Sequence, residues 1–343
     1  MKKYNVAILG ATGAVGQEFI KLIEERNFPF GEMKLLASAR SAGKKLMVAG
    51  REYTVEEATP ESFAGIDIAL FAGGSASKTF APHAVKAGAV VIDNSSTFRM
   101  DPTVPLVVPE VNPEAVRNHQ GIIANPNCST IIMVMALKPI HDKAPIKRVV
   151  VSTYQAVSGA GKEGIDELTE QVKAVSEGRP VEAKILPSAS LPKHYQIAFN
   201  LLPQIDVFLE DGYTKEEMKM VHETRKIMNV PDMAITATTI RVPVYRSHSE
   251  SINLELEAPL SVAEAQATLA AFPGVIVQDN PAEMEYPMPL FTSSLNEVFV
   301  GRIRADESVK HGLNLWVVGD QIRKGAALNA LQIAELMIAE NLL

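Results

Sequence analysis

The 343-residue sequence has little of what a disulfide, a metal site or a membrane span would need. Its single cysteine, Cys128, excludes a disulfide within the chain and suits a reducing compartment. No segment approaches the roughly 18 consecutive apolar residues of a membrane-spanning helix. No spacing of His, Cys, Asp or Glu is typical of a metal site. We therefore expect a cytoplasmic protein with no metal and no membrane partner.

Positive charge is also scarce. The chain has 33 Lys and Arg against 40 Asp and Glu, a formal net charge of -7. This balance argues against nucleic acid or an anionic membrane as the main partner. A small anionic substrate needs only a few local Arg and Lys side chains, which the sequence does supply. The length exceeds what one hydrophobic core usually sustains, so we expect two domains.

A strand, a glycine turn and a helix follow one another at the start of the chain. Residues 5–9 are apolar, and apolar residues recur at helical spacing after the turn. Such glycines let the backbone approach a pyrophosphate, which then binds the N–H groups at the start of the helix. A tight turn without a ligand has the same pattern, but its place between strand and helix favours a dinucleotide. The expected ligand contacts are Gly10, Ala11, Thr12, Gly13, Ala14, Val15 and Gly16.

The second expected strand, residues 33–37, ends where NAD-binding folds usually carry an acid for the ribose hydroxyls. The sequence there is Ser38-Ala39-Arg40-Ser41, without an acid. An arginine between hydroxyl groups can bind a 2′-phosphate, although a solvated loop arginine would give the same pattern. We predict NADP rather than NAD, bound in part by Ser38, Arg40 and Ser41.

Further strands are expected at 66–71, 90–93, 106–108 and 122–124, separated by helices. This alternation predicts an α/β fold with a doubly wound, Rossmann-type parallel sheet. Ligands of such sheets bind beyond the carboxyl ends of the strands. Gly73 and Arg99 follow two of these ends. We expect Gly73 to contact the cofactor and Arg99 to bind phosphate, with an ordinary surface arginine as the alternative.

The pattern changes after Cys128 to longer strands with alternating apolar and polar residues. It indicates an antiparallel or mixed sheet, with helices at about 163–177, 215–228 and 261–272. We expect an α+β domain over 128–320 that carries the catalytic groups and forms a dimer. The NADP-binding domain would span 1–127 and be completed by a C-terminal helix, 321–343.

Cys128 lies in Asn125-Pro126-Asn127-Cys128, directly before the apolar run 131–137. This turn and cap sequence places it at the N-terminus of a buried helix. Backbone N–H groups and the helix dipole there favour the thiolate, and the same N–H groups can hold an oxyanion. A buried, inert cysteine is the alternative. We interpret Cys128 as the nucleophile.

Gln155 ends an expected strand and opens a glycine-containing loop, in which Ser158 and Gly159 are expected to contact the cofactor. Arg241 can form a bidentate pair with a substrate carboxylate, and His248 can exchange protons near neutral pH. Spacing alone does not select one of the seven histidines.

Taken together, the motifs resemble those of the aspartate-semialdehyde dehydrogenases over essentially the whole chain, from the glycine turn to Gly319-Asp320-Gln321. The resemblance implies a nucleophilic Cys128, an orienting Gln155, a carboxylate-binding Arg241 and an acid–base His248. It also implies phosphate binding by Arg99, Asn127 and Lys219, an amino-group contact at Glu216 and a nicotinamide contact at Gln321. Glu216 and Lys219 equally fit an exposed helical face with paired charges, and Glu217 lies next to Glu216.

The activity implied by the resemblance is the NADPH-dependent reduction of 4-aspartyl phosphate to aspartate 4-semialdehyde through a cysteine thioester. It would run reversibly, in a homodimer, on the route to diaminopimelate, lysine, methionine and threonine. Two alternatives stay open. An N-acetyl-glutamyl-phosphate reductase would want a neutral, roomier site in place of Glu216. A non-catalytic NADP-binding sensor would keep the glycine turn but leave Cys128 inert.

Overall fold

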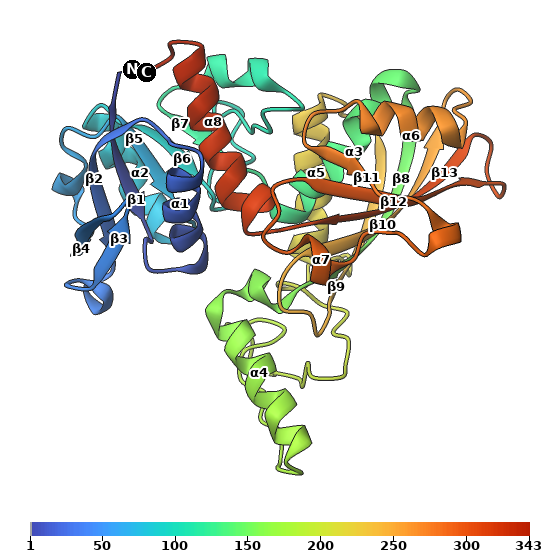
Figure 1. The fold of residues 1–343 in the computed structure, drawn as a ribbon, viewed down its shortest axis with the longest axis horizontal. Coiled ribbons are helices and arrows are strands. Elements are labelled where there is room, and N and C mark those ends of the chain that lie inside the picture. Colours follow the sequence, from blue (N-terminus) through green and yellow to red (C-terminus); the bar gives the residue numbers. More distant parts are fainter. Residues whose placement is uncertain (1) are drawn as a thin grey trace. The chain divides into compact units, whose positions relative to one another are not determined.

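The structure, a computed structural model, describes residues 2–343 and divides into two compact units (Figure 1). Unit 1 comprises Met1–Asn127 and Gly325–Leu343, and unit 2 comprises Cys128–Lys324. The chain therefore passes from unit 1 into unit 2 at the peptide bond before the single cysteine. It returns after Lys324.

Unit 1 is built on a seven-stranded sheet in the order β3-β4-β2-β1-β5-β6-β7. All neighbours are parallel except β3 and β4, which form an antiparallel edge hairpin. The prediction of a doubly wound parallel sheet is confirmed. The strands are β1 (Tyr4–Leu9), β2 (Phe30–Ala37), β3 (Lys45–Val48), β4 (Arg51–Glu57), β5 (Ile68–Phe71), β6 (Val90–Asp93) and β7 (Ile122–Ala124).

The prediction of a strand at residues 106–108 of unit 1 is wrong. Only a single bridge forms, between Leu106 and Ala124. The ladder stops because the N–H of Val108 donates to the Asn112 side chain (2.9 Å) instead of to a neighbouring strand. The hairpin of β3 and β4 was not among the predicted elements.

Three helices cover the sheet of unit 1: α1 (Ala14–Glu25), α2 (Ala76–Lys86) and α8 (Leu328–Ala339). Helix α1 buries Phe19 and Ile23 on one face, as the helical spacing predicts. Helix α8 contacts α1, β5 and β6, so the C-terminal segment completes the core of this unit. The expected long C-terminal helix begins instead with a π-helical turn over Arg323–Ala327.

Unit 2 holds a six-stranded mixed sheet in the order β11-β12-β13-β10-β8-β9. The pairs β11–β12 and β8–β9 are parallel and the other three are antiparallel. The expected α+β architecture is confirmed. The strands are β8 (Ile146–Gln155), β9 (Ala234–Arg241), β10 (His248–Leu256), β11 (Val275–Val277), β12 (Val298–Asp306) and β13 (Gly312–Gly319).

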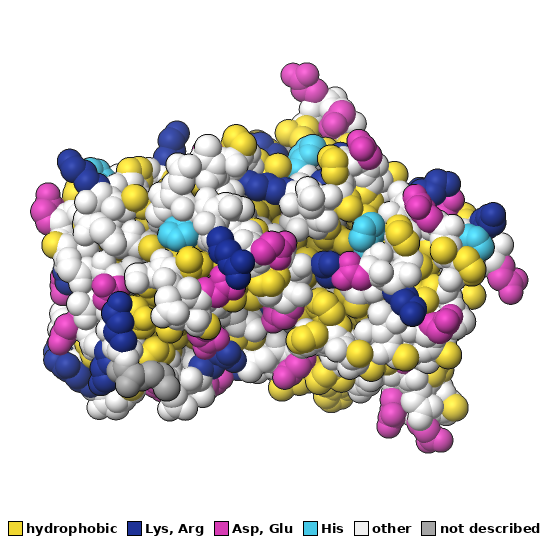
Figure 2. Space-filling model, turned by 90° about the horizontal axis from the view of Figure 1, so that it is seen from above, with side chains coloured by type: hydrophobic (Ala, Val, Ile, Leu, Met, Phe, Trp, Pro, Cys, Tyr) yellow, Lys and Arg dark blue, Asp and Glu magenta, His cyan; other side chains and the backbone are white. Residues whose placement is uncertain are grey.

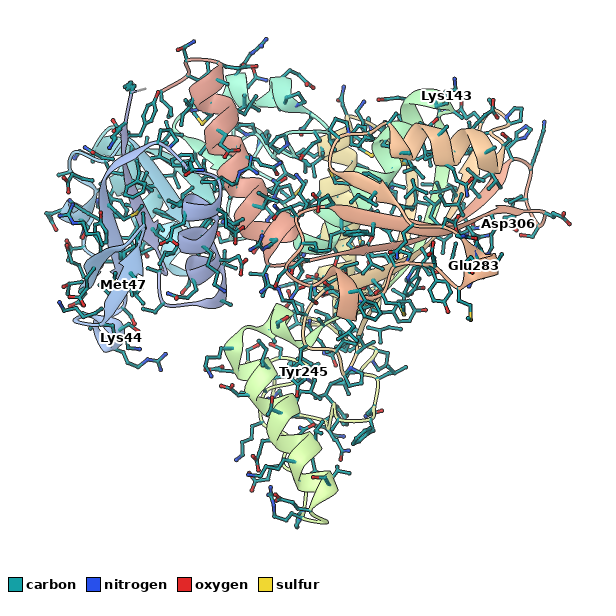
Figure 3. All side chains as sticks on the ribbon, viewed as in Figure 1. Lys44, Met47, Lys143, Tyr245, Glu283 and Asp306 are labelled. Carbon is teal, nitrogen blue, oxygen red and sulfur yellow. The ribbon has the colours of Figure 1, made fainter. Side chains whose placement is uncertain are left out.

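Helices α3 (Cys128–Lys143), α5 (Lys215–Met228) and α6 (Val262–Ala270) contact the strands of this sheet and pack together through α3. Helix α4 (Lys162–Ser176) and the loop after it extend away from the sheet, and a short α7 (Pro289–Thr292) lies nearer to it (Figure 1). Tyr245 lies beside α4, and Thr169 donates a hydrogen bond to its hydroxyl (3.2 Å; Figure 3).

Acidic and basic side chains are intermingled over the face seen in Figure 2. Among residues 2–343, no helix is long and apolar enough to cross a membrane.

The interior of unit 2 contains one carboxyl group that has no hydrogen-bond partner among the described residues. Glu250 is fully buried on β10, between Thr153 of β8 and Val317 of β13 in the sheet register. Burial disfavours the charged form and raises the pKa of Glu250 well above its ordinary range. Burial therefore favours the neutral carboxyl in the folded chain.

This burial predicts a pH-dependent effect of Glu250→Gln on stability. In the unfolded chain Glu250 ionises above its ordinary pKa of 4.5, whereas in the folded chain it stays protonated. The wild type therefore loses stability as pH rises from 4.5 toward the raised pKa, and the glutamine variant does not. We expect the melting temperature of Glu250→Gln, relative to wild type, to be higher at pH 8 than at pH 4.5.

Glu255→Gln is the matched control, because Glu255 is a partly exposed residue of the same strand. A hydrogen bond from Lys147 lowers the pKa of Glu255, so its contribution to stability is present above the unfolded pKa. The melting temperature of Glu255→Gln, relative to wild type, should therefore be lower at pH 8 than at pH 4.5, which is the opposite of the result expected for Glu250→Gln. A difference for Glu250→Gln that is the same at both pH values would show that Glu250 is ionised in the fold.

Candidate active site

The glycine turn of unit 1 brings the start of α1 close to strand β1. Gly10 takes a left-handed conformation (φ +85°), and Gly13 donates to its carbonyl (3.0 Å). A Cβ on Gly16 would lie 2.2 Å from the Gly10 oxygen, so only glycine allows this packing. Gly13 occupies the N-cap position of α1 and makes no side-chain hydrogen bond, so the N–H groups of the first helical turn face the loop without a side-chain cap. These features fit a bound phosphate.

The loops after β1, β5 and β6 lie next to one another at one edge of the sheet. A Cβ on Gly10 would be 3.1 Å from Ala72, and one on Gly73 would be 3.8 Å from the backbone of Asn94. On the other side of the glycine turn, Thr12 donates to the Ser41 hydroxyl (3.3 Å). Ser38 and Arg40 are exposed beside Ser41. The predicted cofactor residues of unit 1 thus line one continuous edge.

Arg99 belongs to the same edge. Its Nε donates to the Asn125 carbonyl (2.9 Å) and its Nη2 to the Asn94 carbonyl (2.8 Å). The side chain of Asn125 donates to Asn94 (2.8 Å) and accepts from Asn329 of α8 (2.7 Å). Arg99 is therefore a buried side chain that stabilises the segment leading to Asn127, rather than a solvated surface charge.

Helix α3 begins at Cys128, as the sequence predicts. The thiol is partly exposed, whereas the residues that follow it in the helix, from Ser129 to Leu137, are buried. Its neighbours in unit 2 are strongly charged: the negative charges of Glu216 and Cys128 both act to raise the pKa of Arg241, against a larger lowering by burial. The cysteine, the arginine and the glutamate are thus electrostatically coupled.

The backbone of Ala156, just past the end of β8, holds two side chains of the site. Its carbonyl accepts a hydrogen bond from Arg241 Nη1 (2.7 Å), and its N–H donates to His248 Nδ1 (3.1 Å). A Cβ on Gly159 would lie 2.5 Å from Arg241 Nη1 and 3.4 Å from His248 Cε1. The loop thus places arginine and histidine together and leaves no room for a side chain at Gly159.

Gln155, Glu216 and Lys219 form one cluster in unit 2. Gln155 donates to Glu216 (3.3 Å), and Lys219 donates to the other oxygen of Glu216 (3.1 Å) and to Asp206 (2.9 Å). Burial lowers the pKa of Lys219, but the two carboxylates outweigh it and the net change is upward. Lys219 therefore carries a positive charge.

Glu217 has a different function from its neighbour. One carboxylate oxygen accepts from the N–H of Thr214 (2.7 Å) and the other from the N–H of Thr239 (2.9 Å). Glu217 closes the capping box of α5 and ties the helix to β9. Of the two adjacent glutamates, Glu216 is the one in the polar cluster.

Gln321 joins the loop after β8 to the start of β10. It accepts a hydrogen bond from the N–H of Ser247 (2.8 Å) and donates to the hydroxyl of Ser158. Ser247 has a left-handed backbone (φ +71°), which is unfavourable for serine and needs such support. The buried Asp320 next to Gln321 accepts from Arg246 (2.5 Å) and from the N–H of Ser294 (2.6 Å).

The histidine of the site is neutral. His248 is fully buried, and this burial lowers its pKa well below the usual range. The positive charge of Arg241 acts in the same direction, whereas a hydrogen bond to the backbone of Ser247 acts in the opposite one.

The sequence analysis assigned no role to four residues of unit 2 that the structure singles out. Ala156 acts through its backbone, which residue type does not reveal. Asp206 meets Lys219 only through the tertiary fold, and Glu250 looks like one of many strand glutamates. Asp320 is part of the quoted terminal motif, but its hydrogen bonds to Arg246 and Ser294 connect distant loops.

Comparison with known proteins agrees with this geometry. Residues 5–119 match the family model "Semialdehyde dehydrogenase, NAD binding domain", and residues 137–324 match "Semialdehyde dehydrogenase, dimerisation domain". The aspartate-semialdehyde dehydrogenase of Aquifex aeolicus is 61% identical over 99% of both chains. That of Bacillus subtilis is 53% identical over 98% of both.

The chain belongs to the aspartate-semialdehyde dehydrogenase family. It is therefore an oxidoreductase, and neither alternative left open by the sequence is favoured. Among solved structures, the Vibrio cholerae aspartate semialdehyde dehydrogenase II complexed with ASA has a TM-score of 0.93, at 47% identity and 99% coverage of both chains. The Candida albicans enzyme with NADP has a TM-score of 0.76, at 27% identity over the whole of both chains.

Proposed function

We propose that this member of the family reduces 4-aspartyl phosphate to aspartate 4-semialdehyde with NADPH, through a thioester on Cys128. The observation that carries the proposal is the cluster in unit 2, where Arg241 is electrostatically coupled both to Cys128 at the start of α3 and to Glu216. A thiolate, a fixed cation and a buried carboxylate suit a substrate with an acyl carbon, a carboxylate and an amino group.

The cofactor-binding residues proposed in unit 1 are those of the glycine turn, Ser38, Arg40, Ser41 and Gly73. Ser158, Gly159 and Gln321 would contribute from unit 2. The close packing at Gly16 and the uncapped start of α1 support phosphate binding, and Arg40 beside hydroxyl groups supports a 2′-phosphate. When bound, NADPH supplies the hydride that reduces the thioester. The NADP-bound Candida albicans relative supports the same choice.

Cys128 attacks the acyl carbon as a thiolate, and the sulfur–carbon bond forms as the bond to phosphate breaks. The N–H groups at the start of α3 and the Asn127 amide stabilise the oxyanion. Arg241 binds the α-carboxylate, and Glu216 binds the amino group, with Gln155 orienting the acyl group. Arg99 and Lys219 bind the phosphate. His248 acts at the oxygen of the same carbonyl.

The proposal includes a homodimer, supported by the match of residues 137–324 to a dimerisation domain. A cytoplasmic location and a place in the biosynthesis of lysine, methionine and threonine belong to it as well. The single cysteine suits a reducing compartment.

The first prediction of this proposal is phosphate-dependent NADPH formation from NADP and aspartate 4-semialdehyde. N-acetylglutamate semialdehyde should give none, because Glu216 is matched to a free amine. Cys128→Ser should abolish turnover, since a serine hydroxyl is far less readily ionised than a cysteine thiol and is a much weaker nucleophile. Binding of NADP, measured by calorimetry, should be unchanged. Equal turnover by the serine variant would remove the nucleophile assignment.

Gly159→Ala should disturb Arg241 without harming the fold. The new Cβ would lie 2.5 Å from Nη1, which the Ala156 carbonyl holds in place. Losing a charge-assisted hydrogen bond of about 1.5–3 kcal/mol predicts a loss of roughly 10- to 100-fold in kcat/KM, mainly through KM. Ala160→Ser, one residue further on, is the control. An unaltered KM in Gly159→Ala would contradict the role of Arg241.

Arg40→Ala should reduce the preference for NADP over NAD. The guanidinium of Arg40 would face a 2′-phosphate that NAD lacks, so removing it should raise the KM for NADP by about tenfold and leave the KM for NAD nearly unchanged. Arg51→Ala, an exposed arginine of β4, is the control. Parallel changes for both cofactors would place the 2′-phosphate elsewhere.

A further inference from the structure

Asp320, just past the end of β13, takes no part in the proposed chemistry, yet its buried carboxylate accepts four hydrogen bonds. One oxygen, Oδ1, accepts from the backbone N–H groups of Ile322 and Arg323, each over 2.9 Å. The other, Oδ2, accepts from Arg246 Nε (2.5 Å) and from the N–H of Ser294 (2.6 Å). All four partners are donors, so the site is matched to an ionised carboxylate.

The two bonds at Oδ1 shape the turn that carries Gln321. They run from the Asp320 side chain to the N–H groups two and three residues further on, which is how an aspartate caps the start of a helix. The π-helical turn Arg323–Ala327 begins at the second of these residues. Gln321 lies inside the closed loop, so its backbone has little freedom while the carboxylate holds both N–H groups.

The two bonds at Oδ2 connect the same carboxylate to the loop that binds the Gln321 side chain. Arg246 lies directly before Ser247, and the N–H of Ser247 donates to Gln321 Oε1 (2.8 Å). The N–H of Ser294 fixes the carboxylate from a further loop of unit 2. Asp320 therefore holds both the backbone of Gln321 and the loop that contacts its amide.

The amide of Gln321 is held at both ends and still has capacity for a ligand. Its oxygen accepts from Ser247, and its nitrogen donates to the hydroxyl of Ser158. A primary amide has two N–H donors and two acceptor sites. One hydrogen and one lone pair therefore remain, which match the acceptor and the donor of a nicotinamide carboxamide.

We infer that Asp320 is a positioning residue for the cofactor: its carboxylate fixes the turn and the loop that aim the Gln321 amide at the nicotinamide carboxamide. Asp320 acts through Gln321 and does not itself touch the cofactor. This inference rests on the proposed function for the contact at Gln321. An asparagine cannot replace the carboxylate, because its amide N–H groups would oppose two of the four donors.

The 3-acetylpyridine analogue of NADP tests the contact, because its acetyl group keeps the acceptor of the carboxamide but lacks the N–H donor. The measured quantity is kcat/KM with NADP divided by kcat/KM with the analogue, in the direction of aldehyde oxidation. Comparing this discrimination between variants cancels the different reactivity of the analogue. Gln321→Ala should reduce it by about three- to tenfold, the usual contribution of one neutral hydrogen bond.

Asp320→Asn should reduce the discrimination nearly as much as Gln321→Ala does. In the Gln321→Ala background it should have no further effect on the discrimination, because a residue that acts through Gln321 has nothing left to position. A purely structural role predicts a lower melting temperature with the discrimination of the wild type. That result in a folded Asp320→Asn would overturn the inference.

Asp279→Asn is the matched control. The Asp279 carboxylate of unit 2 likewise accepts only from donors: the N–H groups of Arg302 (2.8 Å) and Ile303 (3.0 Å) and the Gln266 side chain (3.0 Å). This variant should lower the melting temperature and leave the discrimination unchanged. A reduced discrimination in Asp279→Asn would show that loss of stability alone produces the effect, and would overturn the inference.

A second variant covers the case in which Asp320→Asn does not fold. Arg246→Gln removes one donor and leaves Asp320 its three backbone N–H donors. Because the loop before Ser247 is then released on one side, the discrimination should fall by part of the amount seen for Gln321→Ala. Discrimination equal to that of the wild type would overturn the inference.

Failure of the inference and failure of the proposed function are distinguishable. If the wild type oxidises neither semialdehyde, the proposed reaction fails, and the ratio of the two Kd values, measured by calorimetry without substrate, still decides the role of Asp320. If Gln321→Ala is impaired and Asp320→Asn is not, the proposed function stands and the inference falls. If Gln321→Ala keeps the discrimination of the wild type, the nicotinamide contact and the inference fall together.

Discussion

The positions of the proposed catalytic groups of unit 2 depend on where strand β8 ends. Ala156, the first residue beyond it, offers one carbonyl and one N–H that no longer belong to the sheet ladder, and these hold Arg241 and His248. If β8 were one residue longer or shorter, the carbonyl and N–H of Ala156 would point away from Arg241 and His248. The adjacent Gln155 still lies in the sheet, paired with Arg241, and turns toward Glu216. The end of β8 thus helps to position Arg241, His248, Gln155 and Glu216. The absence of a side chain at Gly159 leaves room for Arg241 and His248.

The buried charges of this site are arranged so that few of them stand alone. Glu216 has a cation in Lys219 and a donor in Gln155, and Lys219 shares a second carboxylate with Asp206. Arg241 keeps its charge in a buried place because Glu216 and Cys128 oppose the effect of burial. Where no such partner is present, burial favours the neutral form: it lowers the pKa of His248 and raises the pKa of Glu250. Burial of an isolated charge is too unfavourable to persist, so neutrality follows from the same physics as pairing.

Much of this could be predicted from the sequence, because periodicity and turn chemistry are local. The glycine turn, the helix after Cys128 and the parallel order of unit 1 all follow from patterns of a few residues. The strand at 106–108 could not be judged in this way, since the Asn112 side chain takes the N–H that the ladder needs. The choice of Glu216 over Glu217 depended on contacts with β8 and β9, which are distant in sequence. Backbone groups such as those of Ala156 leave no trace in residue type at all.

The crossing from unit 1 to unit 2 explains why the cysteine stands at position 128. The residues before it are braced within unit 1 through Asn125, which bonds to Asn94 and to Asn329 of α8, while Arg99 donates to its carbonyl. Cys128 itself begins α3, which packs against helices and strands of unit 2. The proposed nucleophile and the N–H groups at the start of α3 therefore belong to the same unit as Arg241, His248 and Glu216. Only Asn127 and Arg99 among the proposed substrate ligands belong to unit 1.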